Sequence, residues 1–271
     1  MQRPIPSTGE LLPVVGLGTW QTFDVRTSEE KVPLKEVLKT LVANGGKVVD
    51  SSPMYGRSEE VTGELSEDAG VNDQLFIATK VWTAGKESGI QQMKASLRLL
   101  RRRRIELMQV HNLTDWSTHL STLREWRDQG IVKYIGITHY TESAYPQIEK
   151  IMRDEPIDFM QVNYSLGSTR ARERLFPLAM EKKIAVLINR PFEEGALFRR
   201  FRNEPLPEWA KEADCASWGN IFLKFILAQP AVTCIIPGTS KPTHLLDNLN
   251  AAKGVPPNPD IVSKMEGLLK N

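Results

Sequence analysis

The feature that most constrains the fold is a regular alternation of short apolar segments with longer amphipathic ones. Eight apolar segments are rich in Val, Ile or Leu and show no clean polar alternation, which is typical of strands buried on both faces of a parallel sheet. Each is followed by a helical pattern, at a spacing of about 30 residues, and this order predicts a (β/α)8 TIM barrel. The segments cover residues 14–20, 47–52, 76–82, 105–111, 132–139, 159–165, 185–191 and 233–238.

The helical segments have readable ends. Serine favours the N-cap of a helix, and glycine or proline commonly follows the last turn. Gly45–Gly46, Gly130 and Pro230 stand where such segments stop. The predicted helix starts are Ser28, Ser58, Ser117, Ser143 and Ser217.

The two ends of the chain lie outside the eight repeats. Residues 3–14 place Thr8–Gly9 between short extended pieces, which predicts a small hairpin that closes the bottom of the barrel. Residues 258–270 predict a last packing helix. No linker, repeat or low-complexity stretch divides the chain, so we expect one domain over residues 1–271.

Composition limits the partners. Hydrophobic residues make up 41% and charged residues 25%, with a net charge of +2, which favours neither a nucleic-acid nor a membrane partner. The run Arg101–Arg104 ends an amphipathic helix, where it complements the helix dipole and is expected to face water. Oligomeric state stays open between a monomer and a weak homo-oligomer.

The cysteines and the N-terminus bear on location. Cys215 and Cys234 stand in apolar surroundings without the spacing of metal ligands, which favours two buried thiols in a reducing compartment. The first residues lack the apolar core of a signal peptide, and no segment approaches ~20 apolar residues. A cytoplasmic location is therefore expected.

Four titratable residues are predicted at one rim of the barrel. The catalytic groups of such barrels project from the C-terminal ends of strands. Asp50, Lys80 and His111 end three consecutive predicted strands, and Tyr55 follows Asp50 by five residues. Any one of them alone fits a rim salt bridge, a structural histidine or ordinary packing. Together, at one barrel mouth, the four indicate a functional site.

The residue types suit protonation of an oxygen on which negative charge develops. A free tyrosine has a pKa near ~10, and a neighbouring Lys80 ammonium is expected to lower that of Tyr55. Asp50 would keep Lys80 charged and in place, and His111 could donate a hydrogen bond to the substrate oxygen. This chemistry fits carbonyl reduction, which also needs a hydride donor. Gly16 and Gly18 form only a GxG, so a Rossmann-type nucleotide site is weakly indicated.

At these residues the chain resembles the aldo-keto reductases, as a short bacterial-type member. The combination of Asp50, Tyr55, Lys80 and His111 is highly specific, and further segments match in family order over almost the whole length. These segments are GLGTW (16–20), VVDSSPMYG (48–56), IATK (77–80), LMQVHN (107–112), QVNYS (161–165) and IIPGTSKPTHLLDN (235–248).

The resemblance implies an oxidoreductase of the alcohol dehydrogenase or carbonyl reductase type. Its substrates would be aldehydes or ketones, Tyr55 would be the general acid, and NADP(H) would be the cofactor, with NAD(H) as the alternative. Two residues depart from the family pattern around the nicotinamide: His139 replaces an asparagine, and Asn189 replaces a tyrosine that often stacks on the ring. The cofactor-binding residues implied are Thr138, His139, Gln161, Asn189, Arg190, Phe192, Gly195, Leu197, Gly238, Thr239, Ser240, Lys241, His244, Asp247 and Asn248.

The resemblance also implies a substrate pocket with aromatic walls, which suits a small ligand that has some apolar surface. Asn112 stands where many members carry tryptophan, so the pocket is expected to be open. Trp116 is a further candidate wall. The implied pocket residues are Trp20, Phe23, Met54, Trp82 and Asn112.

Two other functions remain as alternatives. In a Schiff-base aldolase Lys80 would be the nucleophile, but this leaves Tyr55 and the strand-8 motif unexplained. A nicotinamide-binding regulatory or sensor subunit would bind cofactor without turnover, but nothing in the four catalytic residue types favours it.

Overall fold

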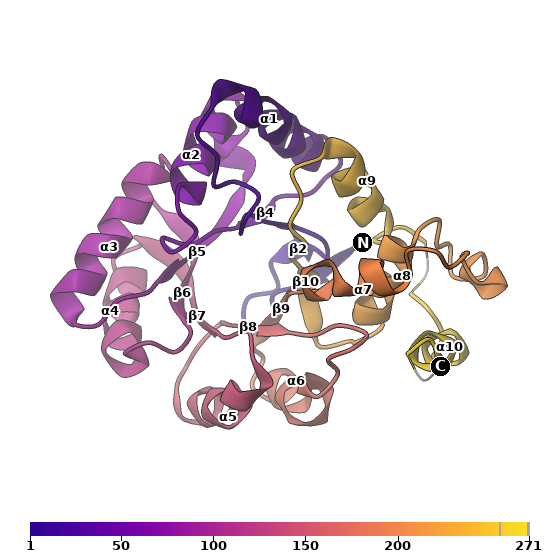
Figure 1. Cartoon of the computed structure of the whole chain (residues 1–271). Helices are drawn as coiled ribbons and strands as arrows, with labels where there is room; N and C mark the ends of the chain where they lie inside the picture. Colours follow the sequence, from indigo (N-terminus) through magenta and orange to yellow (C-terminus); the bar gives the residue numbers. More distant parts are fainter. Residues whose placement is uncertain (255, 270–271) are drawn as a thin grey trace.

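The eight predicted strands form one parallel sheet that closes into a barrel (Figure 1). The computed structural model describes residues 1–254 and 256–269. Strand order follows the chain, and the first and last strands meet through the bridges Val15–Ile235 and Gly18–Gly238. The strands are β3 (Leu17–Gly18), β4 (Val48–Asp50), β5 (Phe76–Val81), β6 (Ile105–His111), β7 (Val132–Thr138), β8 (Phe159–Asn163), β9 (Ala185–Asn189) and β10 (Val232–Ile235).

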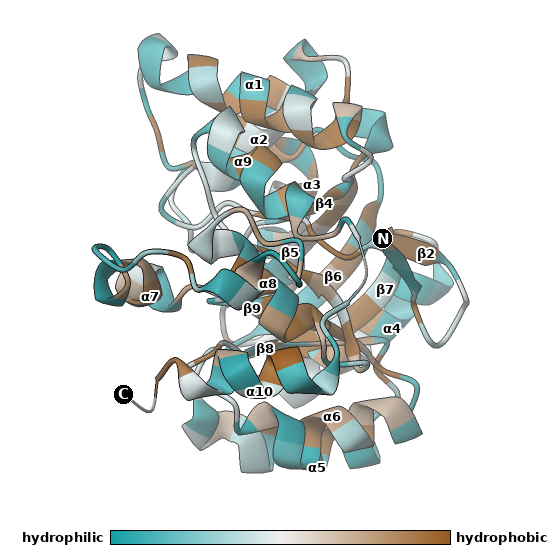
Figure 2. Ribbon diagram, turned by 90° about the vertical axis from the view of Figure 1, so that its right-hand side faces the viewer, coloured by the Kyte–Doolittle hydropathy of each residue, from teal (hydrophilic) through white to brown (hydrophobic). Residues whose placement is uncertain are grey.

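Helices surround the barrel, and the TIM-barrel prediction is confirmed (Figure 1). Eight of the described helices form the ring: α1 (Ser28–Ala43), α2 (Ser58–Asp68), α3 (Lys86–Leu99), α4 (Trp116–Asp128), α5 (Tyr145–Asp154), α6 (Ala171–Glu181), α8 (Trp218–Leu227) and α9 (Pro242–Asn250). Short α7 (Ala196–Arg200) lies in the long β9–α8 connection, and α10 (Pro259–Gly267) packs near α8 (Figure 2). Single 3-10 turns are η1 (Asn72–Gln74), η2 (Glu142–Ala144), η3 (Glu193–Gly195) and η4 (Glu208–Ala210).

The strand β3 is much shorter than the segment predicted for it. Its two glycines allow close backbone approach: a Cβ on Gly16 would lie 2.8 Å from the Val48 carbonyl oxygen, and one on Gly18 would lie 2.7 Å from that of Ile236. Such contacts are tighter than real Cβ atoms tolerate. The glycines of the GxG therefore serve barrel closure, which agrees with the weak case for a Rossmann site.

A hairpin closes the bottom of the barrel, as predicted. Strands β1 (Gln2–Pro4) and β2 (Leu11–Pro13) pair antiparallel. The Tyr134 hydroxyl donates to Glu10 Oε2 at 2.7 Å and lies 2.9 Å from Thr8 Oγ1, which fixes the hairpin to β7. Above the hairpin lies a buried layer inside the barrel, made of Ile5, Leu12, Val48, Phe76, Ala78, Leu107, Tyr134, Phe159, Ala185, Leu187, Cys234 and Ile236.

The predicted helix starts are close, but most predicted caps are wrong. Ser217 is the N-cap of α8 and accepts a hydrogen bond from the Asn220 backbone N–H at 3.0 Å. At α1 the cap is Thr27, one residue before the predicted Ser28. Thr27 has the extended backbone that a cap needs, and it forms a capping box with Glu30. The other predicted caps lie inside or before their helices: Ser58 and Ser117 fall within the first turns of α2 and α4, and Ser143 within η2.

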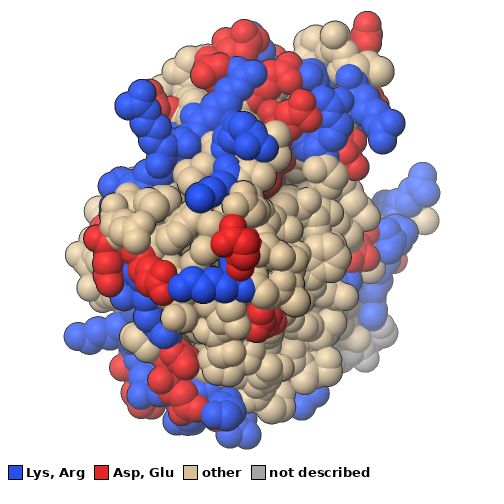
Figure 3. Space-filling view, turned by 90° about the vertical axis from the view of Figure 1, so that its left-hand side faces the viewer, with Lys and Arg blue, Asp and Glu red and all other residues tan. Residues whose placement is uncertain are grey.

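The arginine run is only partly solvated, so that expectation needs correction. The Arg102 side chain is 10% exposed, donates to Glu106 Oε1 at 2.6 Å and to the Asn72 carbonyl at 2.7 Å. It thereby ties the α3–β6 connection to the loop after α2. Basic and acidic side chains are interspersed on this face of the molecule (Figure 3).

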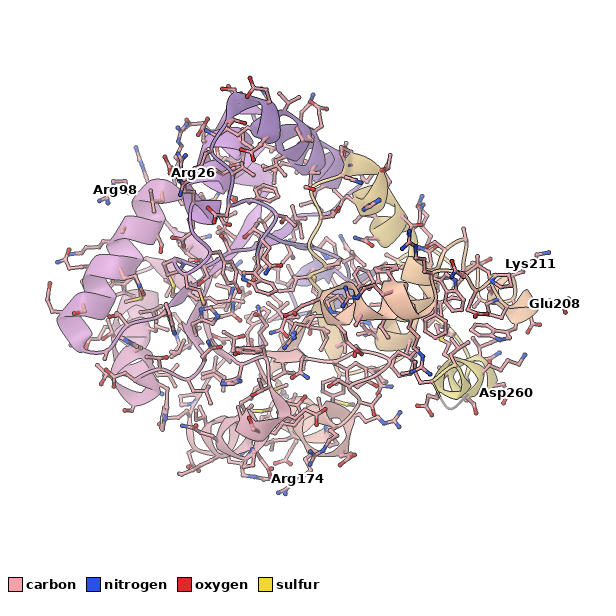
Figure 4. The ribbon with its side chains drawn as sticks, viewed as in Figure 1. Arg26, Arg98, Arg174, Glu208, Lys211 and Asp260 are labelled. Atoms are coloured by element: carbon pink, nitrogen blue, oxygen red, sulfur yellow. The ribbon has the colours of Figure 1, made fainter. Side chains whose placement is uncertain are left out.

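Other charged groups point into solvent, as Arg98, Arg174 and Lys211 do in Figure 4. Cys215 and Cys234 are free and buried, as predicted, and burial raises the pKa of Cys215 to about 11. Within the described ranges, no helix has both the length and the apolar character needed to cross a bilayer.

Candidate active site

Three neighbouring strands carry Asp50, Lys80 and His111 to the same rim. Asp50 and His111 are the last residues of β4 and β6, and Lys80 is the last but one of β5. Register aligns Asp50 with Ala78 and Lys80 with Gln109, so Lys80 and His111 each lie two residues beyond the partner of the preceding site residue, and the three side chains share one face of the sheet. Tyr55 comes from the loop between β4 and α2.

Asp50 and Lys80 form a buried ion pair. Lys80 Nζ donates to Asp50 Oδ2 at 2.7 Å and to the Ser51 carbonyl at 2.6 Å, and the two side chains are 0% and 3% exposed. Burial opposes the ammonium form of Lys80, but the charge of Asp50 and the Tyr55 phenol outweigh it, so the pKa of Lys80 is raised. Lys80 is therefore a cation at neutral pH.

Tyr55 lies beside this cation. Its ring centroid is 4.8 Å from Lys80 Nζ. Burial raises the pKa of Tyr55, and the opposing influence of Lys80 does not reverse the shift. The expectation of a lowered pKa is thus wrong in direction, because burial disfavours the phenolate more than the ammonium favours it. The phenol keeps its proton at neutral pH and is available as an acid.

His111 faces Tyr55 edge-on, with ring centroids 5.8 Å apart. Burial, helped by the positive charges of Lys80 and His139, lowers the pKa of His111 to about 2. The imidazole is therefore neutral. Its Nδ1 lies 3.1 Å from the Ser52 hydroxyl, and a proton donated by Ser52 would leave the other proton on Nε2.

Two glutamines hold the other oxygen of Asp50. Gln161 Nε2 donates to Asp50 Oδ1 at 2.8 Å, and Gln109 Nε2 donates at 3.3 Å. Gln109 Oε1 is buried without a hydrogen-bond partner among the described residues. Sequence reasoning missed Gln109 and Ser52, although Gln109 precedes His111 by two residues and so shares its face of the strand.

The predicted nicotinamide residues come together at the ends of β7, β8 and β9. Thr138 Oγ1 donates to Gln161 Oε1 at 2.9 Å. Asn189 Nδ2 lies 3.3 Å from the His139 carbonyl and 3.4 Å from Gln161 Oε1. Asn189 Oδ1 is buried and, within the described chain, has no partner. The His139 ring stacks on Tyr140 at 5.4 Å.

The residues predicted near the pyrophosphate follow β9. Arg190 pairs with Glu194 at 2.8 Å, and its guanidinium lies 5.4 Å from the centroid of the Tyr140 ring. Phe192 packs on Phe198 at 4.8 Å. Gly195 takes a φ of 81° that a side chain would strain. The Leu197 side chain lies in the core, so only its backbone could meet a ligand.

The remaining cofactor candidates surround the start of α9. Lys241 is the exposed N-cap residue, and its N–H donates to Thr239 Oγ1 at 3.1 Å. Ser240 is half-buried, and Gly238 and His244 are exposed. Asp247 already accepts a hydrogen bond from Ser217 Oγ at 2.6 Å and one from Asn220 Nδ2 at 3.3 Å, whereas Asn248 is buried next to it.

Large apolar side chains stand exposed around the rim. Trp20, Met54 and Trp82 are 41%, 37% and 43% exposed. The Trp82 ring centroid is 6.3 Å from that of His111, so this tryptophan lies at the mouth.

The other predicted pocket residues differ in how deeply they are buried. Phe23 is fully buried in the core, so its prediction as a pocket wall is wrong: the sequence pattern does not separate a rim aromatic from one that turns inward. Trp116, at the start of α4, packs partly against the core. Asn112 has a φ of 51° and is partly buried. Its Oδ1 has no hydrogen-bond partner in the part of the chain that the structure describes.

Comparison with known proteins identifies the family of this chain. The sequence pattern of the Aldo/keto reductase family matches residues 14–270. Methylglyoxal reductase YeaE of Escherichia coli is 25% identical over 91% of this chain and 88% of its own length. Aldo-keto reductase YhdN of Bacillus subtilis is 26% identical, and the match spans 74% of this chain but only 64% of YhdN.

Solved structures show the same fold. The aldo/keto reductase of Klebsiella pneumoniae, solved with NADP and acetate, superposes with a TM-score of 0.81 at 19% identity, over 96% of this chain and 92% of that one. The thermostable aldo-keto reductase Tm1743, solved with the inhibitor epalrestat, gives 0.80 at 23% identity over 99% of both. With its family pattern matched from the first barrel strand to the last helix, the chain belongs to the aldo/keto reductase family.

Proposed function

We propose that this protein reduces the carbonyl group of aldehydes or ketones to an alcohol, with NADP(H) as cofactor and Tyr55 as the general acid. One observation carries the proposal. A protonated phenol lies next to a buried Lys80–Asp50 ion pair and a neutral His111, at the mouth of one barrel. This combination can donate a proton to an oxygen and stabilise the charge left behind.

Each of the four residues has a distinct part in this chemistry. His111 donates a hydrogen bond from Nε2 to the carbonyl oxygen, because Ser52 occupies Nδ1. Tyr55 gives its proton to that oxygen. The Lys80 ammonium stabilises the phenolate that remains, and Asp50 holds Lys80 in position through the 2.7 Å contact.

The residues fit an extended nicotinamide cofactor, which supplies the hydride when bound. The orphaned acceptor Asn189 Oδ1 lies beside Gln161 and suits a carboxamide N–H donor. At the other end, the exposed Lys241 and the N-terminus of α9 suit a phosphate. The similar aldo/keto reductase of Klebsiella pneumoniae was solved in complex with NADP and with NADPH, which supports NADP(H).

The Lys80–Asp50 ion pair argues against the aldolase alternative. In a Schiff-base aldolase Lys80 would have to become neutral to attack, yet it is ion-paired and its pKa is raised. A sensor subunit would bind NADPH without turnover. Because YeaE is named a methylglyoxal reductase, methylglyoxal is the first small substrate to test.

The decisive experiment compares wild type with Tyr55→Phe. NADPH oxidation is followed at the cofactor absorbance band with methylglyoxal and with a panel of larger aldehydes and ketones. We expect kcat to fall by about 10²–10⁴-fold, the usual contribution of a general acid, while the Kd of NADPH stays close to normal. A variant that kept most of the wild-type kcat would exclude Tyr55 as the acid, and a wild type that binds NADPH without turnover would favour the sensor.

A further inference from the structure

The peptide groups of Trp82 lie just beyond the end of the sheet ladder. The last pair between β5 and β6 is Val81 with Val110, so the Trp82 N–H and carbonyl have no strand partner on that side. The side-chain amide of Gln92, on α3, forms hydrogen bonds with both of these backbone groups. The Trp82 N–H donates to Gln92 Oε1 at 2.6 Å, and Gln92 Nε2 donates to the Trp82 carbonyl at 3.2 Å. Gln92 thus pairs with Trp82 as a neighbouring strand would.

Two more side chains hold the rest of this four-residue loop. His119 Nε2 donates to the Thr83 carbonyl at 2.6 Å, and Asp115 Oδ2 accepts from the Gly85 N–H at 2.8 Å. His119 is fully buried and packs directly on Gly89 of α3, where a Cβ would collide with its ring. The loop between β5 and α3 is therefore fixed by groups from α3, from α4 and from the residue before α4.

The fixed loop presents an apolar surface to the mouth. Trp82 remains 43% exposed, although its backbone is held at both polar groups and its ring lies 6.3 Å from His111. The backbone that carries the indole is thus held before a ligand arrives, which reduces the ordering cost of binding.

We propose that Gln92 is a positioning residue that sets substrate affinity through Trp82, without touching the substrate itself. The inference rests on the proposed carbonyl reduction. It predicts that Gln92 matters for carbonyls large enough to lie on the indole and hardly matters for a small one. The effect appears in KM more than in kcat, because the indole packs against the bound substrate and takes no part in proton transfer.

The neighbouring Gln91 offers a matched control. It lies on the same helix, is exposed, and donates to Glu87 Oε1 at 2.7 Å instead of contacting the loop. Gln92→Met removes both hydrogen bonds while keeping a long, helix-favouring side chain. Gln91→Met makes the same chemical change one position away.

The test is a double-mutant cycle with two aldehydes, methylglyoxal and 2-naphthaldehyde. For Gln92→Met we expect KM for 2-naphthaldehyde to rise about five- to tenfold, the cost of ordering one freed side chain on binding, with kcat within about twofold. KM for methylglyoxal should change by less than about twofold, as should both values for Gln91→Met. In a Trp82→Ala background, Gln92→Met should have no further effect.

A measurement independent of activity checks the contact itself. Hydrogen exchange of the peptide that contains Trp82 should accelerate in Gln92→Met and stay unchanged in Gln91→Met and in Gln92→Glu, which keeps the acceptor for the Trp82 N–H. An equal rise in KM with and without Trp82, or unchanged exchange in Gln92→Met, would overturn the role of Gln92 alone. Absence of NADPH-dependent turnover in the wild type would overturn the proposed function, and the role of Gln92 with it.

Discussion

Removing the Lys80 ammonium tests how the ion pair beneath the mouth contributes to both folding and chemistry. Lys80→Met fills a similar volume but leaves Asp50 as a buried carboxylate without its cation. Removing one partner of a buried pair costs about 3–5 kcal/mol. Gln109 and Gln161 still donate to Asp50 Oδ1, so we expect the lower end, about 3 kcal/mol.

The loss comes from a buried charge that has lost its partner, so removing that charge as well should reverse it. The double variant Asp50→Asn/Lys80→Met, which has no charge to bury, should regain most of the stability at neutral pH.

Urea unfolding followed by circular dichroism measures the effect. With an m-value of about 3 kcal/mol/M, a loss of ~3 kcal/mol moves the midpoint down by about 1 M at neutral pH. The double variant should recover most of this shift. Equal midpoints for Lys80→Met and wild type, or a double variant no more stable than Lys80→Met, would refute a stabilising ion pair between Asp50 and Lys80.

Three further outcomes follow from the same site. The pKa of His111 is lowered to about 2, so in mild acid the unfolded chain binds a proton that the folded chain excludes. The free energy of unfolding should therefore fall by about 2 kcal/mol between pH 7 and pH 5. Thermal melts of His111→Gln should not show this decrease of about 2 kcal/mol. Lys241→Ala should weaken NADPH about tenfold or more and leave NADH almost unchanged, whereas equal losses in the two Kd values would show that the 2′-phosphate is not read there. Borohydride treatment with 2-naphthaldehyde should leave no substrate mass on Lys80, since an ammonium paired with Asp50 does not attack a carbonyl, and a trapped adduct found by peptide mass analysis would favour the aldolase.

The sequence was most informative where strand geometry decides the outcome. Asp50, Lys80 and His111 end consecutive buried strands, and parallel strands must bring such residues to one rim. The identity of single residues was less informative about where a helix begins. Thr27 and Ser28 are adjacent residues that can both cap a helix, and only the backbone conformation selects Thr27.

The features that could not be predicted from the sequence are those that depend on how deeply a side chain is buried. The direction of the Tyr55 pKa shift is set by how much of the phenol loses water, and residue types alone carry no such information. Phe23 and Trp20 stand three residues apart in one loop, yet one is core and the other is exposed. Gln92 contacts Trp82 from ten residues away, a pairing that becomes visible only when α3 is placed beside β5.

The hairpin under the barrel closes the end opposite the mouth. Below the Asp50–Lys80 pair lies a buried apolar layer, and Ile5 and Leu12 seal it from the hairpin side. For the proposed chemistry, the proton that Tyr55 gives away must be replaced through the same mouth that the alcohol leaves by. Release of the alcohol and reprotonation of Tyr55 then use the same opening. The side chains around the mouth that contact the substrate therefore also control how water reaches Tyr55.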